Sequence, residues 1–339
     1  MSDQERFRFV VVGSGNISRT YVDAVAALGD AEIVGIVSRS GGRPDNAKGS
    51  PVYPSIEAAA EALPFDAVIL CTPNGLHHEA AAAAAACGKH VLTEKVLDIT
   101  RANMDAMDLA CASAGVVLAV AFQRRMSPDN RAVKTLLDAR SLGRVYAADM
   151  RVKFYRDMGY YDSAGYRGGY EIDGGGPFIQ QAAHNVDVFS WFFGMPEEVV
   201  SMLGTLRWEI EVEDHGVAAM RYADGMIGSI IASTVCGPRG YPPVLEIHAE
   251  KGSITMVNDE ITSWEIDGIG NPSSRDGFAV HSGADSAAVS DTSGHQAIIA
   301  DFVRAVRTGC EPAVPAAQGR MATELVLQIY EAGGRKTAD

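Results

Sequence analysis

The sequence has few of the features that mark exported, membrane-spanning or fibrous proteins. Its five cysteines are an odd number and include no C-x-x-C pair, so they do not describe a disulfide framework and fit reduced thiols. The first residues lack the basic start and apolar run of a signal peptide, and no apolar stretch approaches the ~18 residues of a membrane span. We therefore expect a cytoplasmic protein without a membrane partner.

Positive charge is scarce among the 339 residues. There are 29 Lys and Arg against 43 Asp and Glu, which gives a formal net charge of −14 at pH 7. This excess of acid disfavours nonspecific binding to nucleic acid, so any phosphate group must be held by a local site. With 47% hydrophobic residues and 35 Gly, the composition is that of a globular protein. At ~100–200 residues per domain, the length predicts two domains.

Strand-like and helix-like stretches alternate as far as residue 122. The expected strands lie at 7–12, 32–37, 67–72, 89–93 and 116–122. Because these mostly apolar strands alternate with helices, they predict an α/β domain with a doubly wound parallel sheet that is covered on both sides. We place this first domain at residues 1–122.

The pattern changes beyond residue 143, where strands are separated by polar turns. Several of them alternate apolar with polar residues, which indicates an antiparallel sheet with one covered face. We therefore expect an α+β domain with a large open sheet over residues 123–339. Its strands are predicted at 145–154, 198–206, 216–222, 226–234, 244–249 and 253–257. Its helices are predicted at 128–139, 177–193, 295–307 and 318–332, with a mobile loop at 267–294. The sequence leaves open that the last two helices pack back toward the first domain.

A glycine-rich turn with the pattern G-x-G-x-x-S follows the first strand and opens a helix. This is the context of a dinucleotide-binding fingerprint, whose glycines allow a tight turn and close approach of the backbone to a pyrophosphate at the helix N-terminus. Ser18 replaces the third glycine with another small residue. A glycine-rich turn without a ligand is the alternative. The residues of this turn that we assign to the cofactor are Gly13, Ser14, Gly15, Asn16 and Ile17.

The residues after the second strand bear on the choice between NADP and NAD. An acidic residue that accepts the ribose 2′-hydroxyl is expected ~20 residues beyond the fingerprint. Ser38, Arg39 and Ser40 occupy that place instead. Because no carboxylate repels a 2′-phosphate there and an arginine is present to bind it, NADP is favoured over NAD. A solvated loop cation is the alternative for Arg39.

Two further stretches carry candidate catalytic groups. Lys95 follows a strand at the carboxyl edge of the predicted sheet, where an ammonium suits a developing alkoxide, although Glu94-Lys95 alone more often forms a surface ion pair. On the helix predicted from Pro177, Gln180, His184 and Asp187 lie opposite an apolar stripe. The alternative is that these three polar residues have no catalytic role and simply face water. The three glycines before this helix permit close approach of a ligand or a neighbouring backbone, and histidine suits general base chemistry.

Taken in order, these motifs resemble the glucose–fructose oxidoreductase and inositol dehydrogenase (Gfo/Idh/MocA) family over nearly the whole chain. The resemblance rests on the glycine turn, Thr72-Pro73-Asn74 with His77, Glu94-Lys95, and the stretches at 122–128, 160–168 and 174–187. It implies a Rossmann fold followed by an open, mainly antiparallel sheet whose outer face often forms an oligomer contact. A homodimer or homotetramer is therefore expected.

The resemblance also implies roles for single residues. His184 accepts the hydroxyl proton, Lys95 holds and polarises the oxygen, and Gln180 orients the substrate, because an amide cannot take a proton. Val96 replaces the family's proline, which leaves open whether the peptide bond after Lys95 is cis. The cofactor residues beyond the glycine turn are Ser38, Arg39, Thr72, Asn74, His77, Glu94, Lys95, Gln123 and Arg167. The substrate-binding residues are Lys95, Arg124, Tyr160, Tyr161, Gln180 and His184, the tyrosines being equally explained by packing.

We therefore expect an NADP- or NAD-dependent oxidoreductase that transfers a hydride between a secondary alcohol of a sugar, sugar derivative or cyclitol and the nicotinamide. A glycosidase that uses bound NAD(P) for transient oxidation and a noncatalytic nucleotide-sensing regulator are the alternatives. No metal site is expected, because the sequence has neither H-E-x-x-H nor a convergent Cys/His cluster. His78 is expected on a helix surface.

Overall fold

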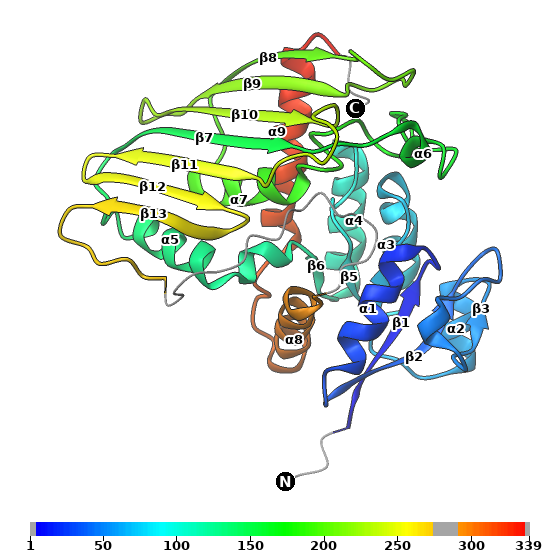
Figure 1. Ribbon diagram of the computed structural model, residues 1–339. Coiled ribbons are helices and arrows are strands. Elements are labelled where there is room, and N and C mark those ends of the chain that lie inside the picture. The colour runs from blue at the N-terminus through cyan, green and yellow to red at the C-terminus, as the bar shows by residue number, and fades with distance from the viewer. Residues whose placement is uncertain (1–4, 274–290, 336–339) are drawn as a thin grey trace. The chain divides into compact units, whose positions relative to one another are not determined.

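The computed structural model of the protein describes residues 5–273 and 291–335. These residues form two compact units, each of which contains one β-sheet (Figure 1). Within the described residues, the first unit takes in 5–123 and 291–320, and the second takes in 124–273 and 321–335. The segment at 291–320 thus returns to the first unit.

A six-stranded parallel sheet forms the first unit. Its strands stand in the order β3-β2-β1-β4-β5-β6, so the direction of winding reverses between β1 and β4. Open α/β sheets bind ligands beside the carboxyl ends of the strands at this reversal. The doubly wound parallel sheet predicted from the sequence is confirmed. The strands are β1 (Phe7–Val12), β2 (Ala31–Val37), β3 (Val52–Tyr53), β4 (Ala67–Leu70), β5 (His90–Thr93) and β6 (Leu118–Val120).

The helices of the first unit begin and end at recognisable signals. The Thr100 hydroxyl caps α4 by accepting a hydrogen bond from the Asn103 N–H, and Gly115 ends this helix in the left-handed region. Phe302 on α8 packs against the rings of Phe7 and Phe9, which places α8 in this unit's core. The helices are α1 (Asn16–Ala26), α2 (Ile56–Ala62), α3 (His77–Ala86), α4 (Arg101–Ala114) and α8 (Ser293–Thr308).

A seven-stranded sheet forms the second unit, in the order β13-β12-β11-β7-β10-β9-β8. Only β7 and β10 run parallel, so the sheet is mainly antiparallel, as predicted. The edge strand β13 is an addition to the predicted strands. The strands are β7 (Val145–Lys153), β8 (Glu198–Gly204), β9 (His215–Arg221), β10 (Ile227–Ser233), β11 (Val244–Ala249), β12 (Gly252–Val257) and β13 (Glu260–Ile266).

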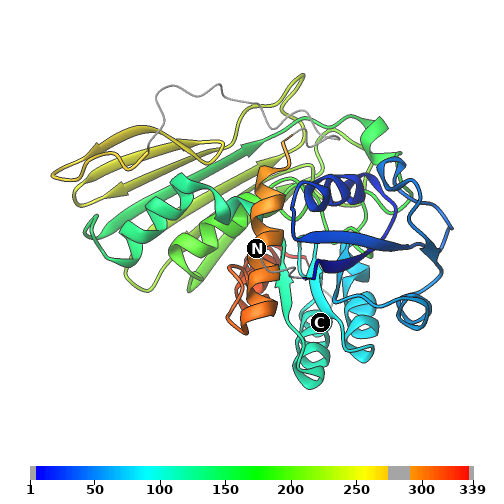
Figure 2. The same ribbon diagram turned by 90° about the horizontal axis from the view of Figure 1, so that it is seen from below.

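Helices cover one face of this sheet. The helices α5 (Pro128–Asp138) and α7 (Ala183–Phe193) lie on the same face in both views (Figure 2). On β7 the buried side chains of Ala148, Met150 and Val152 alternate with more exposed ones, which matches a sheet with one covered face. The described residues also form the helices α6 (Met158–Tyr161) and α9 (Ala316–Ala332).

The helix predicted from Pro177 begins six residues later, at Ala183, and this expectation is therefore wrong. The Glu213 carboxylate accepts hydrogen bonds from the N–H groups of Gly176 (3.1 Å) and Phe178 (3.4 Å). The Gln180 amide donates to the Asp173 carbonyl. These contacts hold the backbone in a turn before the helix starts, and a local sequence pattern does not reveal them.

Other predicted boundaries also differ from the structure, several of them by one or two residues. The strand predicted to reach residue 206 ends at Gly204, because the Asp214 carboxylate accepts the N–H groups of Leu206, Arg207 and Trp208 and turns the chain. The loop predicted at 267–294 lies outside the described residues from 274 to 290, and α8 already begins at Ser293. No helix in the described part of the chain is long and apolar enough to cross a membrane.

Candidate active site

The glycine turn after β1 presents open backbone at the start of a helix. Gly13 has a φ of +113°, and a Cβ added there would lie 2.6 Å from the carbonyl oxygen of Cys71, so this position requires glycine. A Cβ added at Gly15 meets no described atom within 4 Å, and no described side chain caps α1. Ser18 is buried, and its hydroxyl donates to the Gly15 carbonyl. Uncapped N–H groups beside open space fit the pyrophosphate of a dinucleotide.

Hydroxyl groups connect this turn with the end of β2. The Ser14 and Ser38 oxygens lie 3.2 Å apart, and those of Ser38 and Ser40 lie 3.1 Å apart. Arg39 is exposed between the two serines of that segment. These hydroxyls and Arg39 thus lie where the ribose that carries the 2′-phosphate of NADP is expected.

The ends of β4 and β5 are joined by a buried histidine. The Nδ1 atom of His77 lies 2.8 Å from the Val96 carbonyl oxygen, and its Nε2 atom lies 3.0 Å from that of Thr72. Because His77 is fully buried, it positions these two bends rather than offering its ring to a ligand. The hydroxyl of Thr72 is buried and has no hydrogen-bond partner among the described residues, so it is a polar group that a bound molecule would satisfy.

The bend after β5 carries Lys95, which is partly exposed. The peptide bond between Lys95 and Val96 is cis, although valine stands where the family has proline. Glu94 is buried rather than part of a surface ion pair: its carboxylate accepts from the Tyr21 hydroxyl (2.7 Å) and from the Lys95 N–H (3.1 Å). Burial raises the pKa of Tyr21 well above its ordinary value, which keeps this phenol a donor.

The other sequence-predicted residues differ in their surroundings. Asn74 begins a short 3-10 helix before α3 and is partly exposed. The Gln123 amide oxygen is buried without a hydrogen-bond partner, as the Thr72 hydroxyl is. Arg124 lies in the second unit and forms a 3.3 Å ion pair with Asp259. His78 is not simply a surface residue, because its Nδ1 atom lies 3.1 Å from the buried carboxylate of Asp98.

In the second unit, the three polar residues predicted to share a helix face are separated. His184 lies in the first turn of α7 and is partly exposed, and Gln180 lies in the turn before the helix. Asp187 is fully buried and accepts two hydrogen bonds from Arg125, at 2.8 and 2.7 Å. Asp187 therefore neither shares an exposed helix face with Gln180 and His184 nor faces water. Burial raises its pKa to about 6 in spite of the arginine.

The glycines before α7 are required by neighbours within the second unit. A Cβ on Gly175 would lie 2.0 Å from the Tyr330 hydroxyl, and one on Gly176 would lie 1.9 Å from the Glu213 carbonyl oxygen. The buried Glu213 carboxylate also accepts from the Tyr330 hydroxyl at 2.9 Å, and burial raises the pKa of Glu213 to about 7. Sequence reasoning missed Glu213, because a buried carboxylate carries no local signal that separates it from a surface one.

The two predicted substrate tyrosines have different surroundings. Tyr161 is buried, with its hydroxyl 2.8 Å from that of Thr234, and burial raises its pKa to about 12. Packing accounts for Tyr161. The Tyr160 hydroxyl accepts a 3.0 Å hydrogen bond from Gln181, beside the turn that carries Gln180, and the Arg167 guanidinium lies 4.5 Å from the centre of its ring. Among the described residues, no group of three or more His, Cys, Asp or Glu side chains is arranged to hold a metal.

Known proteins match the chain over nearly its full length. Residues 7–122 match the family model of the oxidoreductase family with an NAD-binding Rossmann fold, and residues 130–255 match the GFO/IDH/MocA C-terminal domain. The WlbA dehydrogenase from Bordetella pertussis, solved in complex with NADH and UDP-GlcNAcA, is 30% identical with a TM-score of 0.85, and the match covers 97% of both chains. Inositol 2-dehydrogenase from Rhizobium meliloti (strain 1021) is 26% identical over 346 residues, which cover 98% of this chain and 97% of that one. Myo-inositol 2-dehydrogenase from Thermotoga maritima is 25% identical and covers 93% and 92%. The chain therefore belongs to the Gfo/Idh/MocA family of dehydrogenases, and its first unit is an NAD-binding Rossmann fold.

Proposed function

We propose that the protein transfers a hydride between a secondary alcohol of a sugar, sugar derivative or cyclitol and a nicotinamide dinucleotide, with NADP preferred to NAD. One observation carries the proposal. In the first unit, an uncapped helix start faces open space at Gly15, and Lys95 stands at the carboxyl end of β5 in the same sheet. The relatives named above, which act on inositol or bind a nucleotide sugar, support the substrate class.

The first unit supplies the groups that would hold the cofactor. The N–H groups at the start of α1 suit the pyrophosphate, and Ser38 with Arg39 suits a 2′-phosphate. The unsatisfied hydroxyl of Thr72 and amide oxygen of Gln123 are the further polar groups of this unit. When bound, the cofactor supplies a nicotinamide ring that accepts or returns a hydride. We assign His77 and Glu94 to positioning the two bends, because both are buried and bonded within the unit.

The proposed chemistry assigns one task to each of three side chains. The Lys95 ammonium donates a hydrogen bond to the substrate hydroxyl and stabilises the negative charge that develops on its oxygen. His184 accepts the hydroxyl proton as general base. Gln180 orients the substrate, since its amide exchanges no proton and is itself held by the Asp173 carbonyl. We propose that Lys95 and His184 act on the same hydroxyl group.

A substrate screen tests this proposal. Purified protein is mixed with sugars, cyclitols, sugar acids and nucleotide sugars in the presence of NADP or NAD, and formation of the reduced cofactor is followed by absorbance. The proposal predicts reduction with at least one of these polyols. Saturable nucleotide binding without reduction on the whole panel would favour a regulator, and turnover without net reduction would favour a glycosidase.

We also propose that the protein forms a homodimer or homotetramer through the face of the second sheet opposite α5 and α7. Met202 on β8, Val217 on β9 and Ile231 on β10 stand in one cross-strand row of that face. Met202 is 82% exposed and Val217 is 39% exposed. An exposed apolar row on a sheet is typical of a surface that another chain covers.

A further inference from the structure

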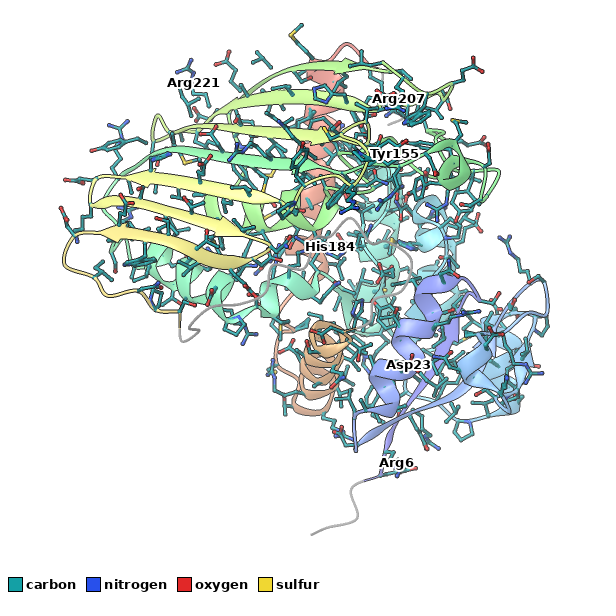
Figure 3. The ribbon with its side chains drawn as sticks, viewed as in Figure 1. Arg6, Asp23, Tyr155, His184, Arg207 and Arg221 are labelled. Carbon is teal, nitrogen blue, oxygen red and sulfur yellow. The ribbon has the colours of Figure 1, made fainter. Side chains whose placement is uncertain are left out.

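Three arginines gather with aromatic rings at one end of the second sheet. Arg156 and Arg167 lie with their guanidinium carbons 5.3 and 4.5 Å from the centre of the Tyr160 ring. Arg207 lies 4.6 Å from the Trp208 ring and 5.5 Å from the Tyr155 ring, and Figure 3 labels Arg207 and Tyr155 side by side. We refer to this group as the arginine cluster. It consists of Arg156, Arg167, Arg207, Tyr155, Tyr160 and Trp208.

The three arginines of the cluster form no salt bridge with a described carboxylate. Within the residues that the structure describes, Arg156, Arg167 and Arg207 form no ion pair, whereas the buried Arg125 is bound at two points by Asp187. The carboxylates beside the cluster accept backbone N–H groups. Asp157 accepts that of Tyr160, Asp173 accepts that of Gly168, and Asp214 accepts three, including that of Arg207. Two of these cations, Arg156 and Arg167, thus share the Tyr160 ring, and Arg207 packs on Tyr155, in a chain whose formal net charge is −14.

The same cluster holds buried hydrogen-bond donors that lack an acceptor. Within the described part of the chain, the buried Nε atoms of Arg156 and Arg167 and the buried indole nitrogen of Trp208 have no hydrogen-bond partner. All three can only donate, so an oxygen-rich anion would satisfy them and another cation would not. Burial is the main cause that lowers the pKa of Arg156, and the charge of Arg167 adds to it, whereas Tyr160, Tyr161 and Asp157 raise that pKa. The Arg156 Nη1 group donates to the Tyr155 carbonyl at 2.8 Å, and stacking on the aromatic rings uses the guanidinium faces, which leaves the other N–H edges for a ligand.

The arginine cluster is connected to the turn that carries a proposed substrate residue. The Tyr160 hydroxyl accepts a 3.0 Å hydrogen bond from Gln181, which follows Gln180 directly and precedes His184 by three residues. The arginine cluster and the turn that carries Gln180 are therefore in direct contact within the second unit.

We propose that the arginine cluster binds an oxyanion of the substrate, either a phosphate or a carboxylate, so that the substrate is an anionic sugar derivative and not a neutral sugar or cyclitol. The inference rests on the proposed function and narrows its substrate class. It also assigns Arg167 to the substrate, whereas the family resemblance implied the cofactor. A guanidinium group suits either anion, because its paired N–H groups match two oxygens.

Binding measurements on the full chain test this inference independently of catalysis. Isothermal titration at low salt, with saturating NAD, uses UDP as the phosphate probe, D-glucuronate as the carboxylate probe, and D-glucose and myo-inositol as neutral controls. Arg207→Gln removes the exposed cation, and Arg156→Lys keeps the charge but loses the planar fork. Arg221→Gln is the matched control, since this exposed arginine pairs with Glu198 at the opposite end of β9 (Figure 3).

We expect UDP or D-glucuronate to bind, and Arg207→Gln and Arg156→Lys each to weaken that binding about 10-fold or more, while Arg221→Gln changes it little. NAD affinity should be the same in all four proteins. Binding of UDP alone identifies a phosphate, and binding of D-glucuronate alone identifies a carboxylate. Failure of both anions to bind, or equal binding by wild type and both cluster variants, overturns the inference.

Hydride transfer separates this inference from the proposed function. A neutral polyol that is oxidised equally fast by wild type and Arg207→Gln would overturn the anionic substrate and leave the dehydrogenase intact. Anion binding that depends on the cluster, without hydride transfer to any compound of the panel, would support the cluster and contradict the dehydrogenase.

Discussion

The position of Lys95 is fixed by side chains that lie far from it in the sequence. Tyr21 on α1 holds the Glu94 carboxylate, and the same carboxylate accepts the Lys95 N–H. On the other side of the bend, His77 lies 2.8 Å from the Val96 carbonyl oxygen. Both neighbours are buried, so they hold the backbone that presents Lys95 without themselves reaching a ligand.

The proposed preference for NADP depends on a single cation, Arg39, so it can be tested at one residue. Arg39→Ala should weaken NADP binding about 10-fold, because a charge-assisted hydrogen bond to the 2′-phosphate contributes ~1.5–3 kcal/mol and Arg39 is exposed to solvent screening. NAD binding should change little. Arg43→Ala is the control, since Arg43 is exposed in the same segment and donates to the Ser50 carbonyl. Fluorescence titration of both nucleotides measures the effect, and equal losses for NADP and NAD would reject the role of Arg39.

At the scale of secondary-structure elements, the turn before α7 depends on one buried carboxylate. Glu213 accepts the N–H groups of Gly176 and Phe178 and the hydroxyl of Tyr330. Burial raises its pKa from 4.5 to about 7, so the folded state binds this proton more tightly than the unfolded state. The stabilisation from the bound proton is complete below pH 4.5 and is lost as the pH rises through 7.

Glu213→Gln should remove that pH dependence. Relative to the variant, the wild type should lose up to about 3 kcal/mol of unfolding free energy between pH 4.5 and 7, as a pKa shift of this size implies. Urea unfolding followed by tryptophan fluorescence reports on the right unit, because Trp191, Trp208 and Trp264 all lie in the second one. Glu211→Gln, at an exposed position two residues away, should keep the wild-type slope. The same slope in wild type and Glu213→Gln would contradict the buried proton.

The elements that could be predicted from the sequence are those whose position is determined by their own residues. Apolar strands and the glycine turn are local signals, and the structure has these features close to where they were expected. The start of α7 was missed because Glu213, 30 residues downstream of Ala183, fixes the preceding turn. The strand β3 has only two residues, which is too short to show a period.

In the candidate site, too, some residues carry a local sequence signal and others are brought together only by contacts between distant parts of the chain. Gly13, Gly15 and Lys95 were found because they stand at fixed places relative to strands and helices. The burial of His77 and Asp187, and the gathering of Arg156, Arg167 and Arg207, result from tertiary contacts that no spacing in the sequence reveals.

At the scale of the whole molecule, the proposed oligomer depends on the exposed apolar row of the second sheet. Met202→Asp places a charge at its most exposed member and should dissociate the assembly, because a buried unpaired carboxylate is costly at an interface. Leu109→Asp is the matched control, since Leu109 is 69% exposed on α4 of the first unit. Light scattering after size exclusion gives the mass. Wild type should show two or four chains, Met202→Asp one chain, and Leu109→Asp the wild-type mass. A wild type that runs as one chain would contradict the assembly.

The central claim is that Lys95 and His184 act on the same hydroxyl group. A double-mutant cycle on single-turnover hydride transfer tests it most directly, using Lys95→Met, His184→Ala and the double variant with the best substrate of the screen. Loss of the proton acceptor alone should slow transfer ~10²–10⁴-fold. Because both groups serve one step, the double variant should be little slower than the slower single variant. Losses that multiply, or an unchanged rate in His184→Ala, would contradict the shared site.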